Sequence, residues 1–471
     1  MTGPLVAAVD QGSTSTKAAV LDAGGGCLEL LRRPVDRRED GRRVEHDPEA
    51  IARDVESLLG ELLDRHRVSA IGIATQRSTC LLWDPGGHPL TPALSWQDRT
   101  ETERVNSLAG HADEVARITG LRLSPHYAAP KLARLLAATT GAARAAERGE
   151  LVAGTLDAFL LHRLTGEPST EPGCAGRTLL YDLEGDAWSP RLGRLFGVPV
   201  AALPPLRPSA GPRGRFHDVP VTALAGDQQA ALLGHGGWRP GVAAAHFGTG
   251  AFVLASTGER LRRHPGLLSA VLASTPERRR LQIEGSVNSA GSAVEWAARL
   301  AGIDLDRWPD RVLDVERLPW CLPAFAGAGA PWWRPEASGV VAGLGLGHTG
   351  DDLLAGVLAG VALRAADCVA AIREAGAEVA TLRVSGRLTR LAGLTELLCE
   401  AARVEVEVAA EAEAGLTGIA RLAALSGAGG EEALAAPPTA TRTHRPTWPA
   451  GEAERLVRRW RRFVQRSLEG P

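Results

Sequence analysis

The chain has 471 residues, and its 53 Lys and Arg side chains nearly balance 55 Asp and Glu side chains. This length corresponds to about two to four domains, and an apolar share of 44% with 23% charged residues excludes disordered and fibrous classes. The balanced charge argues against nucleic acid as a partner, since phosphate backbones are bound by clustered cations. No apolar run approaches the roughly 20 residues that cross a bilayer, and the N-terminus lacks the basic segment and apolar core of a signal peptide. We therefore expect a globular protein with neither nucleic acid nor membrane as a partner.

The six cysteines are scattered along the chain and form no CxxC pair: Cys27, Cys80, Cys174, Cys321, Cys368 and Cys399. Such spacing predicts reduced thiols in a cytoplasmic protein, not a disulfide or zinc framework. Nearly all the cations are arginines, and lysine occurs only at Lys17 and Lys131. A lysine in such a chain either serves as a compact point charge or is present by chance.

Residues 5–10 and 18–21 are short apolar runs, separated by a segment rich in Gly, Ser and Thr that ends at Lys17. Two runs of strand formers around such a turn predict a β-hairpin. The Gly-x-x-x-x-Gly-Lys-Ser/Thr pattern of P-loop proteins does not occur in this segment. A phosphate bound here would therefore be bound by a hairpin.

Further along the first half, hydrophobic periodicity and length predict alternating helices and strands. The predicted elements are helices at 48–65, 132–146, 151–165 and 228–233, and strands at 68–74 and 219–224.

A weak internal repeat then appears, because residues 242–254 again form two apolar runs around a Gly-Thr-Gly turn. The two copies lie about half a chain apart, which predicts two similarly folded domains. Residues 236–241 have the composition of a linker, so we place the domains at 1–237 and 238–471. The second half continues with predicted helices at 286–300, 351–375 and 452–468, a loop at 322–347 and a strand at 382–384.

The two hairpins are candidates for binding a polyphosphate. Glycine lets the backbone approach an anion, and successive N–H groups and hydroxyls donate to phosphate oxygens. Lys17 would add a point charge, and the carboxylate of Asp10 suits Mg²⁺. Taken singly, each turn is equally compatible with an ordinary tight hairpin.

Asp227 is the candidate catalytic residue, because it follows the strand at 219–224, where open α/β sheets place ligands. A carboxylate there can accept the proton of a hydroxyl that attacks a γ-phosphorus. The alternative is an N-cap for the helix at 228–233. Trp96, with Arg77, Gln97 and Asp98, suits a polyol, whose C–H faces stack on rings while its hydroxyls hydrogen-bond. Plain packing is the alternative for Trp96, and for His126 a structural role.

With these residues together, the chain resembles the FGGY carbohydrate kinase family, most of all its glycerol kinase branch. The resemblance covers nearly the whole chain in order. It is carried by residues 10–17, 75–77, 95–100, 154–157, 175–178, 226–232, 247–250, 284–286, 323–327 and 330–333.

The resemblance implies an α/β fold of two actin-like (ribonuclease H-like) domains with a cleft between them. It implies ATP and Mg²⁺ as cofactors, a small polyol or sugar as substrate, and Asp227 as the general base, with Asp10 at the metal. Assembly is left open, with a homodimer as one option. The resemblance assigns acceptor contacts to Arg77, Ser78, Trp96, His126, Gln228 and Phe252, and nucleotide contacts to Gly12, Ser13, Thr14, Lys17, Gly248, Thr249, Gly291, Gly386, Arg387 and Gly418.

Two departures affect the acceptor side. Ser78 stands where glycerol kinases carry an acid, and His126 stands where they carry a tyrosine. Because serine offers one short hydroxyl and leaves more room, we expect a longer polyol or a ketose instead of glycerol.

A third departure affects the nucleotide side. The family's Asp-Gly-Gly-Ala stretch is replaced by Ser385-Gly386-Arg387-Leu388, and Arg387 would either obstruct the adenosine or reach a phosphate. The rival hypothesis is therefore a catalytically degenerate relative that binds a sugar and serves a regulatory role.

Overall fold

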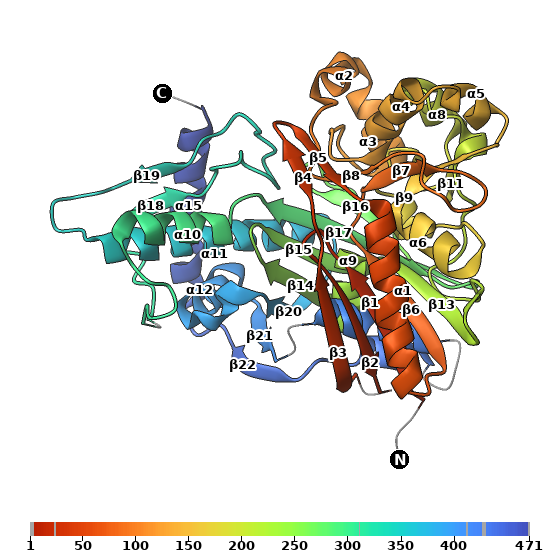
Figure 1. Cartoon of the computed structure of the whole chain (residues 1–471). Coiled ribbons are helices and arrows are strands. Elements are labelled where there is room, and N and C mark those ends of the chain that lie inside the picture. The colour runs from red at the N-terminus through yellow and green to blue at the C-terminus, as the bar shows by residue number, and fades with distance from the viewer. Residues whose placement is uncertain (1–3, 23–24, 310, 411–412, 426–429, 470–471) are drawn as a thin grey trace. The chain divides into compact units, whose positions relative to one another are not determined.

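The computed structural model describes residues 4–22, 25–309, 311–410, 413–425 and 430–469 (Figure 1). The chain forms two compact units. The first comprises Met1–Trp238, Ser269–Leu281 and Glu413–Ala436, and the second comprises Arg239–Leu268, Gln282–Ala412 and Pro437–Pro471. A single division between residues 237 and 238 therefore leaves out two later segments that belong to the first unit.

The first unit is built on a six-stranded sheet in which β1 pairs antiparallel with β2 and parallel with β6, and β6 pairs parallel with β13. Apolar side chains of α1 (Pro48–Arg65) cover one face of this sheet. In sheet order the strands are β12 (Arg215–Phe216), β13 (Val219–Gly226), β6 (Ala70–Thr75), β1 (Val6–Gln11), β2 (Ser15–Leu21) and β3 (Cys27–Pro34).

The other large sheet repeats this plan, as the internal repeat predicted. Its hairpin strand β14 pairs antiparallel with β15 and parallel with β20, and β20 pairs parallel with β21. The order is β22 (Ala440–His444), β21 (Glu405–Ala409), β20 (Val379–Ser385), β14 (Gly241–Phe247), β15 (Ala251–Gly258), β17 (Arg279–Val287) and β16 (Leu268–Ser274). Both predicted hairpins are confirmed, and each lies at the same place in its sheet.

Smaller elements complete the two units. The first unit also contains β4 (Arg38–Asp40), β5 (Arg43–His46), β7 (Cys80–Trp83), β8 (Ala93–Leu94), α2 (Thr102–Ser107), α3 (Ala112–Thr119), α4 (Ala128–Ala138), α5 (Ala142–Glu147), β9 (Val152–Thr155), α6 (Leu156–Thr165), α7 (Pro172–Ala175), β10 (Tyr181–Asp182), β11 (Ala187–Trp188), α8 (Pro190–Phe196), α9 (Asp227–Gly234), α13 (Ala414–Ala424) and α14 (Gly430–Ala435). The second unit also contains α10 (Gly291–Ala301), β18 (Trp320–Leu322), β19 (Val340–Ala342), α11 (Gly350–Glu374), α12 (Ala392–Ala402) and α15 (Ala450–Glu469).

Several predicted boundaries were wrong. The helix predicted at 151–165 begins only at Leu156, because residues 152–155 pair with β7 as a strand. The helix predicted at 132–146 is divided into α4 and α5, and Gly141 between them has a positive φ of 76°. The helix predicted at 286–300 begins at Gly291, since β17 extends to Val287. The loop predicted at 322–347 contains the short strand β19.

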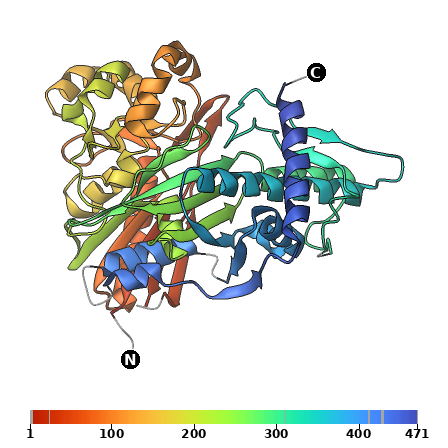
Figure 2. The same ribbon diagram turned by 180° about the vertical axis from the view of Figure 1, so that it is seen from behind.

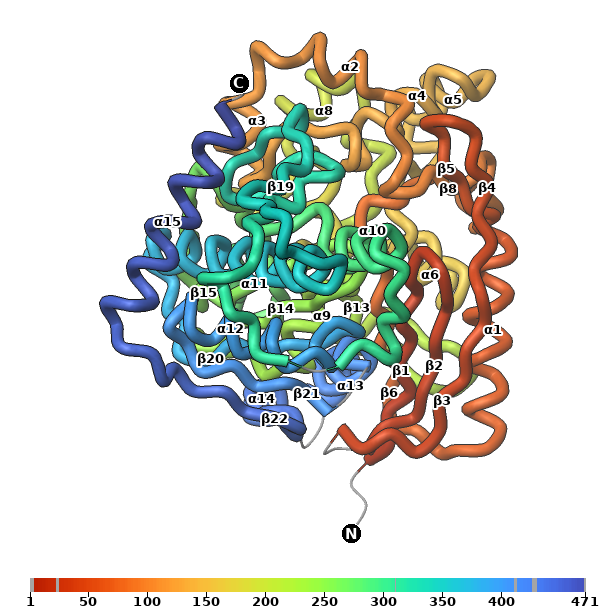
Figure 3. The backbone as a smooth tube through the Cα atoms, turned by 90° about the vertical axis from the view of Figure 1, so that its left-hand side faces the viewer, coloured from red at the N-terminus to blue at the C-terminus, as the bar shows by residue number. Residues whose placement is uncertain are grey.

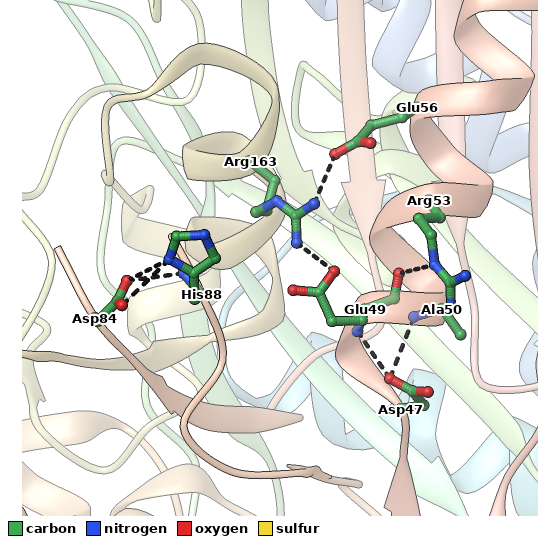
Figure 4. Close-up of polar contacts among 8 residues, drawn as sticks. All are labelled: Asp47, Glu49, Ala50, Arg53, Glu56, Asp84, His88 and Arg163. Atoms are coloured by element: carbon green, nitrogen blue, oxygen red, sulfur yellow. Dashed lines mark hydrogen bonds and ion pairs between the residues drawn. The ribbon is translucent and has the colours of Figure 1, made fainter. Parts of the chain in front are cut away.

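The helix α1 matches its predicted bounds, and the backbone N–H groups of its first turn are hydrogen-bonded. The Asp47 carboxylate accepts from the backbone N–H groups of Glu49 and Ala50, an N-cap that satisfies otherwise unpaired donors. Arg163 of α6 binds Glu49 at 2.7 Å and Glu56 at 3.4 Å (Figure 4). These contacts attach α6 to the helix that covers the first sheet.

Among the described residues, α11 is long and apolar enough to cross a membrane by length and composition, and 89% of its most apolar window is buried inside the protein. The C-terminal helix α15 lies across it, where Trp460 donates to the buried Asp367 at 2.6 Å (Figure 2). α11 is thus a core helix of the second unit.

A close helix crossing joins α13 to the first unit, although α13 lies far along the chain from the sheet that it packs against (Figure 3). A Cβ atom on Gly418 of α13 would lie 1.8 Å from the Ala230 carbonyl oxygen of α9. A Cβ atom on Gly234 of α9 would lie 1.9 Å from the Ala414 carbonyl oxygen. The two helix backbones therefore touch, and only glycine fits at either position.

We predict that Gly418→Ala lowers the free energy of unfolding by about 3 kcal/mol, because the methyl group must separate two packed backbones. Gly60→Ala is the matched control, since Gly60 lies inside α1 and has no neighbour within 4 Å of an added Cβ. This change should gain up to about 1 kcal/mol from helix propensity. Urea denaturation followed by circular dichroism measures both, and equal stabilities of Gly418→Ala and the unmodified chain would contradict the predicted clash.

Candidate active site

The strand ends of the first sheet bring the predicted residues of this unit together. Gln11 lies in register with Thr75, and Thr75 lies in register with Gly226. The three parallel strands β1, β6 and β13 therefore end at one edge, where Asp10, Arg77 and Asp227 follow or close them. The sheet topology thus provides the site predicted at the carboxyl ends of its strands.

Asp227 is the first residue of α9 and is partly exposed. Its Oδ1 accepts from the Gln228 backbone N–H at 2.7 Å and lies 3.5 Å from the Arg77 guanidinium. The N-cap of α9 is Gly226, so the alternative of Asp227 as an N-cap is not what the structure has. A Cβ atom on Gly226 would lie 2.9 Å from the Arg77 side chain, so the glycine makes room for the arginine.

Asp10, the candidate metal residue, is surrounded by other charges. Burial raises the pKa of Asp10 to about 7; the carboxylates of Asp227 and Glu413 raise it as well, and the Lys17 ammonium lowers it. A Cβ atom on Gly415 would lie 3.1 Å from Asp10 Oδ2, so the first turn of α13 lies against this carboxylate. Asp10 therefore has the environment of a carboxylate that a cation would stabilise.

Lys17 contacts a residue that the sequence analysis missed. Its ammonium lies 2.5 Å from the Glu413 carboxylate, and both side chains are partly exposed. The two residues are 396 positions apart, and no spacing in the sequence joins them. Glu413 reaches Lys17 because α13 belongs to the first unit.

Ser13 and Thr14 form the tip of the first hairpin. Gly12 closes the turn by donating its N–H to the Ser15 carbonyl at 3.0 Å. Ser13 is partly exposed and Thr14 is exposed, so both hydroxyls are accessible to a ligand.

Trp96 and His126 adjoin each other on the acceptor side, with ring centroids 6.0 Å apart. His126 Nδ1 lies 3.1 Å from the Trp96 carbonyl oxygen, and because a carbonyl only accepts, Nδ1 carries the proton. Burial lowers the pKa of His126, so the ring is neutral at pH 7 and its Nε2 is an acceptor.

Ser78 has the left-handed φ of 66°, which is uncommon outside glycine. Its hydroxyl donates to the Arg177 carbonyl at 3.0 Å. The donor of Ser78 is thus used within the protein, and its oxygen remains an acceptor.

Two amide oxygens beside these residues are buried and have no hydrogen-bond partner among the described residues. They are Oε1 of Gln228, next to Asp227, and Oε1 of Gln97, next to Trp96. Buried acceptors are normally paired, and hydroxyl groups of a ligand would pair them.

The second hairpin has its own set of close contacts within the second unit. A Cβ atom on Gly291 would lie 2.5 Å from the Gly248 carbonyl, and one on Gly386 would lie 2.3 Å from the Phe247 carbonyl. Both glycines therefore support the hairpin turn, whose tip residue Thr249 is exposed. Phe252 lies on β15 opposite His246 and is partly exposed.

Arg387 and Gly418, the remaining nucleotide-side residues, lie in different units. Arg387 is exposed and pairs with Asp306 at 3.2 Å, and Arg390 binds the same carboxylate. Gly418 lies in the crossing with α9, and that packing accounts for the glycine without a nucleotide.

A cavity of about 500 Å³ lies elsewhere in the second unit, between α11, α15 and residues 331–334. Its carboxylates Asp367 and Glu374 face Arg461 at 3.8 and 3.6 Å. None of the residues predicted for chemistry is among those that line it.

Duplicated sheets with a hairpin each, and a carboxylate at the strand ends of one, fit the class of two-domain sugar and polyol kinases. The pattern of the FGGY family of carbohydrate kinases matches residues 5–234 for its N-terminal domain and residues 243–427 for its C-terminal domain. The chain belongs to this family and is a carbohydrate or polyol kinase.

Individual relatives agree with this assignment. The glycerol kinase of Methylibium petroleiphilum is 36% identical over 496 residues, which cover 98% of this chain and 99% of that protein. The glycerol kinase of Geobacter sp. (strain M21) is 35% identical and is covered to 98%, as is this chain. The crystal structure of Plasmodium falciparum glycerol kinase with ADP has a TM-score of 0.92 at 23% identity, over 99% of this chain and 98% of that one. Xylulose kinase from Rhodospirillum rubrum has a TM-score of 0.88 at 22% identity, over 98% of each chain.

We predict that Asp227→Asn lowers the pKa of Asp10 from its value of about 7, because a nearby like charge is removed. Lys17→Met should raise the same pKa, since it removes an opposite charge. Carboxyl-carbon NMR of protein labelled at aspartate, assigned with Asp10→Asn, measures both shifts. A shift of the Asp10 pKa in the same direction in both variants would contradict the described arrangement of Asp10, Lys17 and Asp227.

Proposed function

We propose that the protein transfers the γ-phosphoryl group of ATP to a hydroxyl of a small polyol or sugar, with Asp227 as the general base. The observation that carries the proposal is the position of Asp227. It is partly exposed at the strand edge, 3.5 Å from Arg77 and next to the unpaired Gln228 oxygen.

Asp227 accepts the proton of the attacking hydroxyl, and its neighbours orient it for this step. The Gln228 N–H and the Arg77 guanidinium both contact Oδ1 and favour the ionised carboxylate. Arg77 also fixes the edge of the site by donating to Gln229 Oε1 at 3.4 Å.

Each hairpin offers donors to phosphate oxygens in this proposal. Backbone N–H groups and hydroxyls of Gly12, Ser13 and Thr14 do so in the first unit, and those of Gly248 and Thr249 do so in the second. Lys17 exchanges its Glu413 partner for a phosphate oxygen, because the ion pair between them is partly solvated and therefore weak.

Asp10 is the residue that would hold Mg²⁺. No group of three or more His, Cys, Asp or Glu side chains in the described part of the chain is placed to hold a metal. Mg²⁺ in phosphate-transfer sites is commonly held by one or two carboxylates together with substrate phosphates. The charged surroundings of Asp10 fit that arrangement, and the ion would neutralise negative charge on the phosphates.

The acceptor is a longer polyol or a ketose. Ser78 leaves more space than an acid and has its donor engaged by Arg177, so it cannot bind adjacent hydroxyls as a carboxylate would. His126 Nε2, Gln97 Oε1 and Gln228 Oε1 all accept, and a chain of substrate hydroxyls can donate to them. Trp96 supplies an aromatic face for the C–H groups between these hydroxyls.

The degenerate relative remains the second candidate, and one observation favours it. Arg387 replaces a small family residue on the nucleotide side, where it pairs with Asp306. The residues of the phosphate hairpins and the base are nevertheless all present.

The reduced cysteines expected from the sequence fit a cytoplasmic enzyme, since all six are free thiols.

We predict that Asp227→Asn lowers kcat by at least about a hundredfold, the lower end of what general-base catalysis supplies. ATP with Mg²⁺ should raise the melting temperature of the variant and of the unmodified enzyme alike, because the hairpins are unchanged. Coupled ADP release and thermal shift measure the two effects. Loss of the nucleotide-dependent shift in the variant would assign Asp227 a structural role. Absence of any shift in the unmodified enzyme at millimolar ATP would favour the degenerate relative.

We predict that kcat/KM for the best polyol or ketose of five or six carbons exceeds that for glycerol by at least about tenfold, because Ser78 in place of an acid leaves room for further hydroxyls. A panel of polyols and sugars assayed by ADP release tests this. Ser78→Glu, which restores the acid of glycerol kinases, should move the preference toward glycerol. A higher kcat/KM for glycerol than for every other compound in the unmodified enzyme would overturn the assignment.

A further inference from the structure

Lys131 lies on α4 and has no part in the proposed chemistry, yet its side chain is fully buried. Its ammonium donates to two backbone carbonyls, those of Ser95 and His126, each at 2.8 Å. Among the residues that the structure describes, no carboxylate lies within ion-pair distance of this ammonium. The acidic groups that act on Lys131 are the buried Cys80 thiol and, more weakly, the buried Asp98 carboxylate.

A buried ammonium bound only to carbonyls is costly, because a cation loses its hydration without gaining an opposite charge. Burial accordingly lowers the pKa of Lys131 to about 8. A methionine would fill similar space without that cost. We therefore infer that the Lys131 ammonium serves to join the two loops whose carbonyls, those of Ser95 and His126, it binds.

Both carbonyls belong to the predicted acceptor loops. Ser95 directly precedes Trp96, and the second carbonyl is that of His126 itself. His126 Nδ1 in turn donates to the Trp96 carbonyl at 3.1 Å. Three hydrogen bonds thus form a closed network that joins Lys131, Ser95–Trp96 and His126. This network fixes the distance between the Trp96 and His126 side chains.

Further hydrogen bonds connect this network to the first hairpin. The Trp96 N–H donates to Thr79 Oγ1 at 3.1 Å, and Thr79 donates to Gln76 Oε1 at 2.9 Å. Gln76 Nε2 then donates to Gln11 Oε1 at 3.1 Å and lies 3.3 Å from the Gly12 carbonyl. The acceptor loops are therefore bonded to the turn that is proposed to bind phosphate.

We propose that Lys131 is a positioning residue for the acceptor: it holds the loops of Trp96 and His126 together, so that the indole face and the free Nε2 of His126 meet the same substrate. The proposal rests on the proposed function, because it needs an acceptor bound at these two side chains. It adds a residue that touches no substrate atom and still sets acceptor affinity and selectivity.

The test is Lys131→Met, with Lys131→Gln as a second variant that retains two donors. We expect Lys131→Met to raise KM for the acceptor roughly ten- to a hundredfold, the effect of misplacing a binding loop. KM for ATP should stay within about twofold. The melting temperature is measured alongside, since the change removes a buried charge but leaves two carbonyls without a donor. Lys131→Gln should recover part of the acceptor affinity.

Leu132→Ala is the matched control, because Leu132 is the next residue of α4 and is equally buried. It should lower stability, since a core cavity is created, without changing KM for the acceptor. If Lys131→Met and Leu132→Ala both lose activity only in proportion to unfolded protein, with KM unchanged, Lys131 is a plain packing residue and the proposal is overturned. A parallel rise of both KM values in Lys131→Met would overturn it as well.

A measurement without substrate separates this proposal from the proposed function. In ¹⁵N-histidine NMR of the ligand-free enzyme, with His126 assigned through His126→Gln, the Nδ1–H tautomer should dominate. Lys131→Met should convert its signal to a mixture of tautomers, because the loop is released. An unchanged His126 signal in Lys131→Met overturns the positioning role even if the kinase activity is found, whereas absence of phosphotransfer to any acceptor by the unmodified enzyme contradicts only the proposed function.

Discussion

Where α9 and α13 cross, backbone meets backbone, and this contact fixes how the start of α13 lies against Asp10. Gly234 and Gly418 leave no space for a side chain, so the helices have a single distance of approach. α9 begins with Asp227, and α13 begins just after Glu413 and lies against Asp10 through Gly415. The electrostatic environment of the candidate site therefore follows from how closely two helices pack.

The duplicated sheet explains why each unit has a hairpin of its own. In each sheet the first hairpin strand has a parallel neighbour, β6 for β1 and β20 for β14, so each turn comes at the end where parallel strands finish. The copies have since acquired different supports. The first turn adjoins charged side chains, whereas the second is backed by Gly291 and Gly386.

Local sequence patterns predicted much of the fold and of the candidate site. The features that they missed depend on contacts between residues far apart in the chain. The hairpins, α1 and the strand before Asp227 could be predicted because turn residues and periodicity act over a few positions. The strand at 152–155 reads as helix in the sequence, because its pairing partner β7 lies about 70 residues earlier. Glu413 could not be found at all, since nothing near it in sequence indicates Lys17. The engaged hydroxyl of Ser78 and the two bonds of Lys131 likewise depend on carbonyls in other loops.

The membership of α13 in the first unit has a consequence for biosynthesis. A ribosome makes the N-terminal sheet early, but the helix that completes it is translated only after residues 235–413. Until then, the face of α9 that carries Gly234 has no partner helix. The first unit therefore completes its fold late in translation, and a chain that ends before Ala414 lacks the helix that packs on this face.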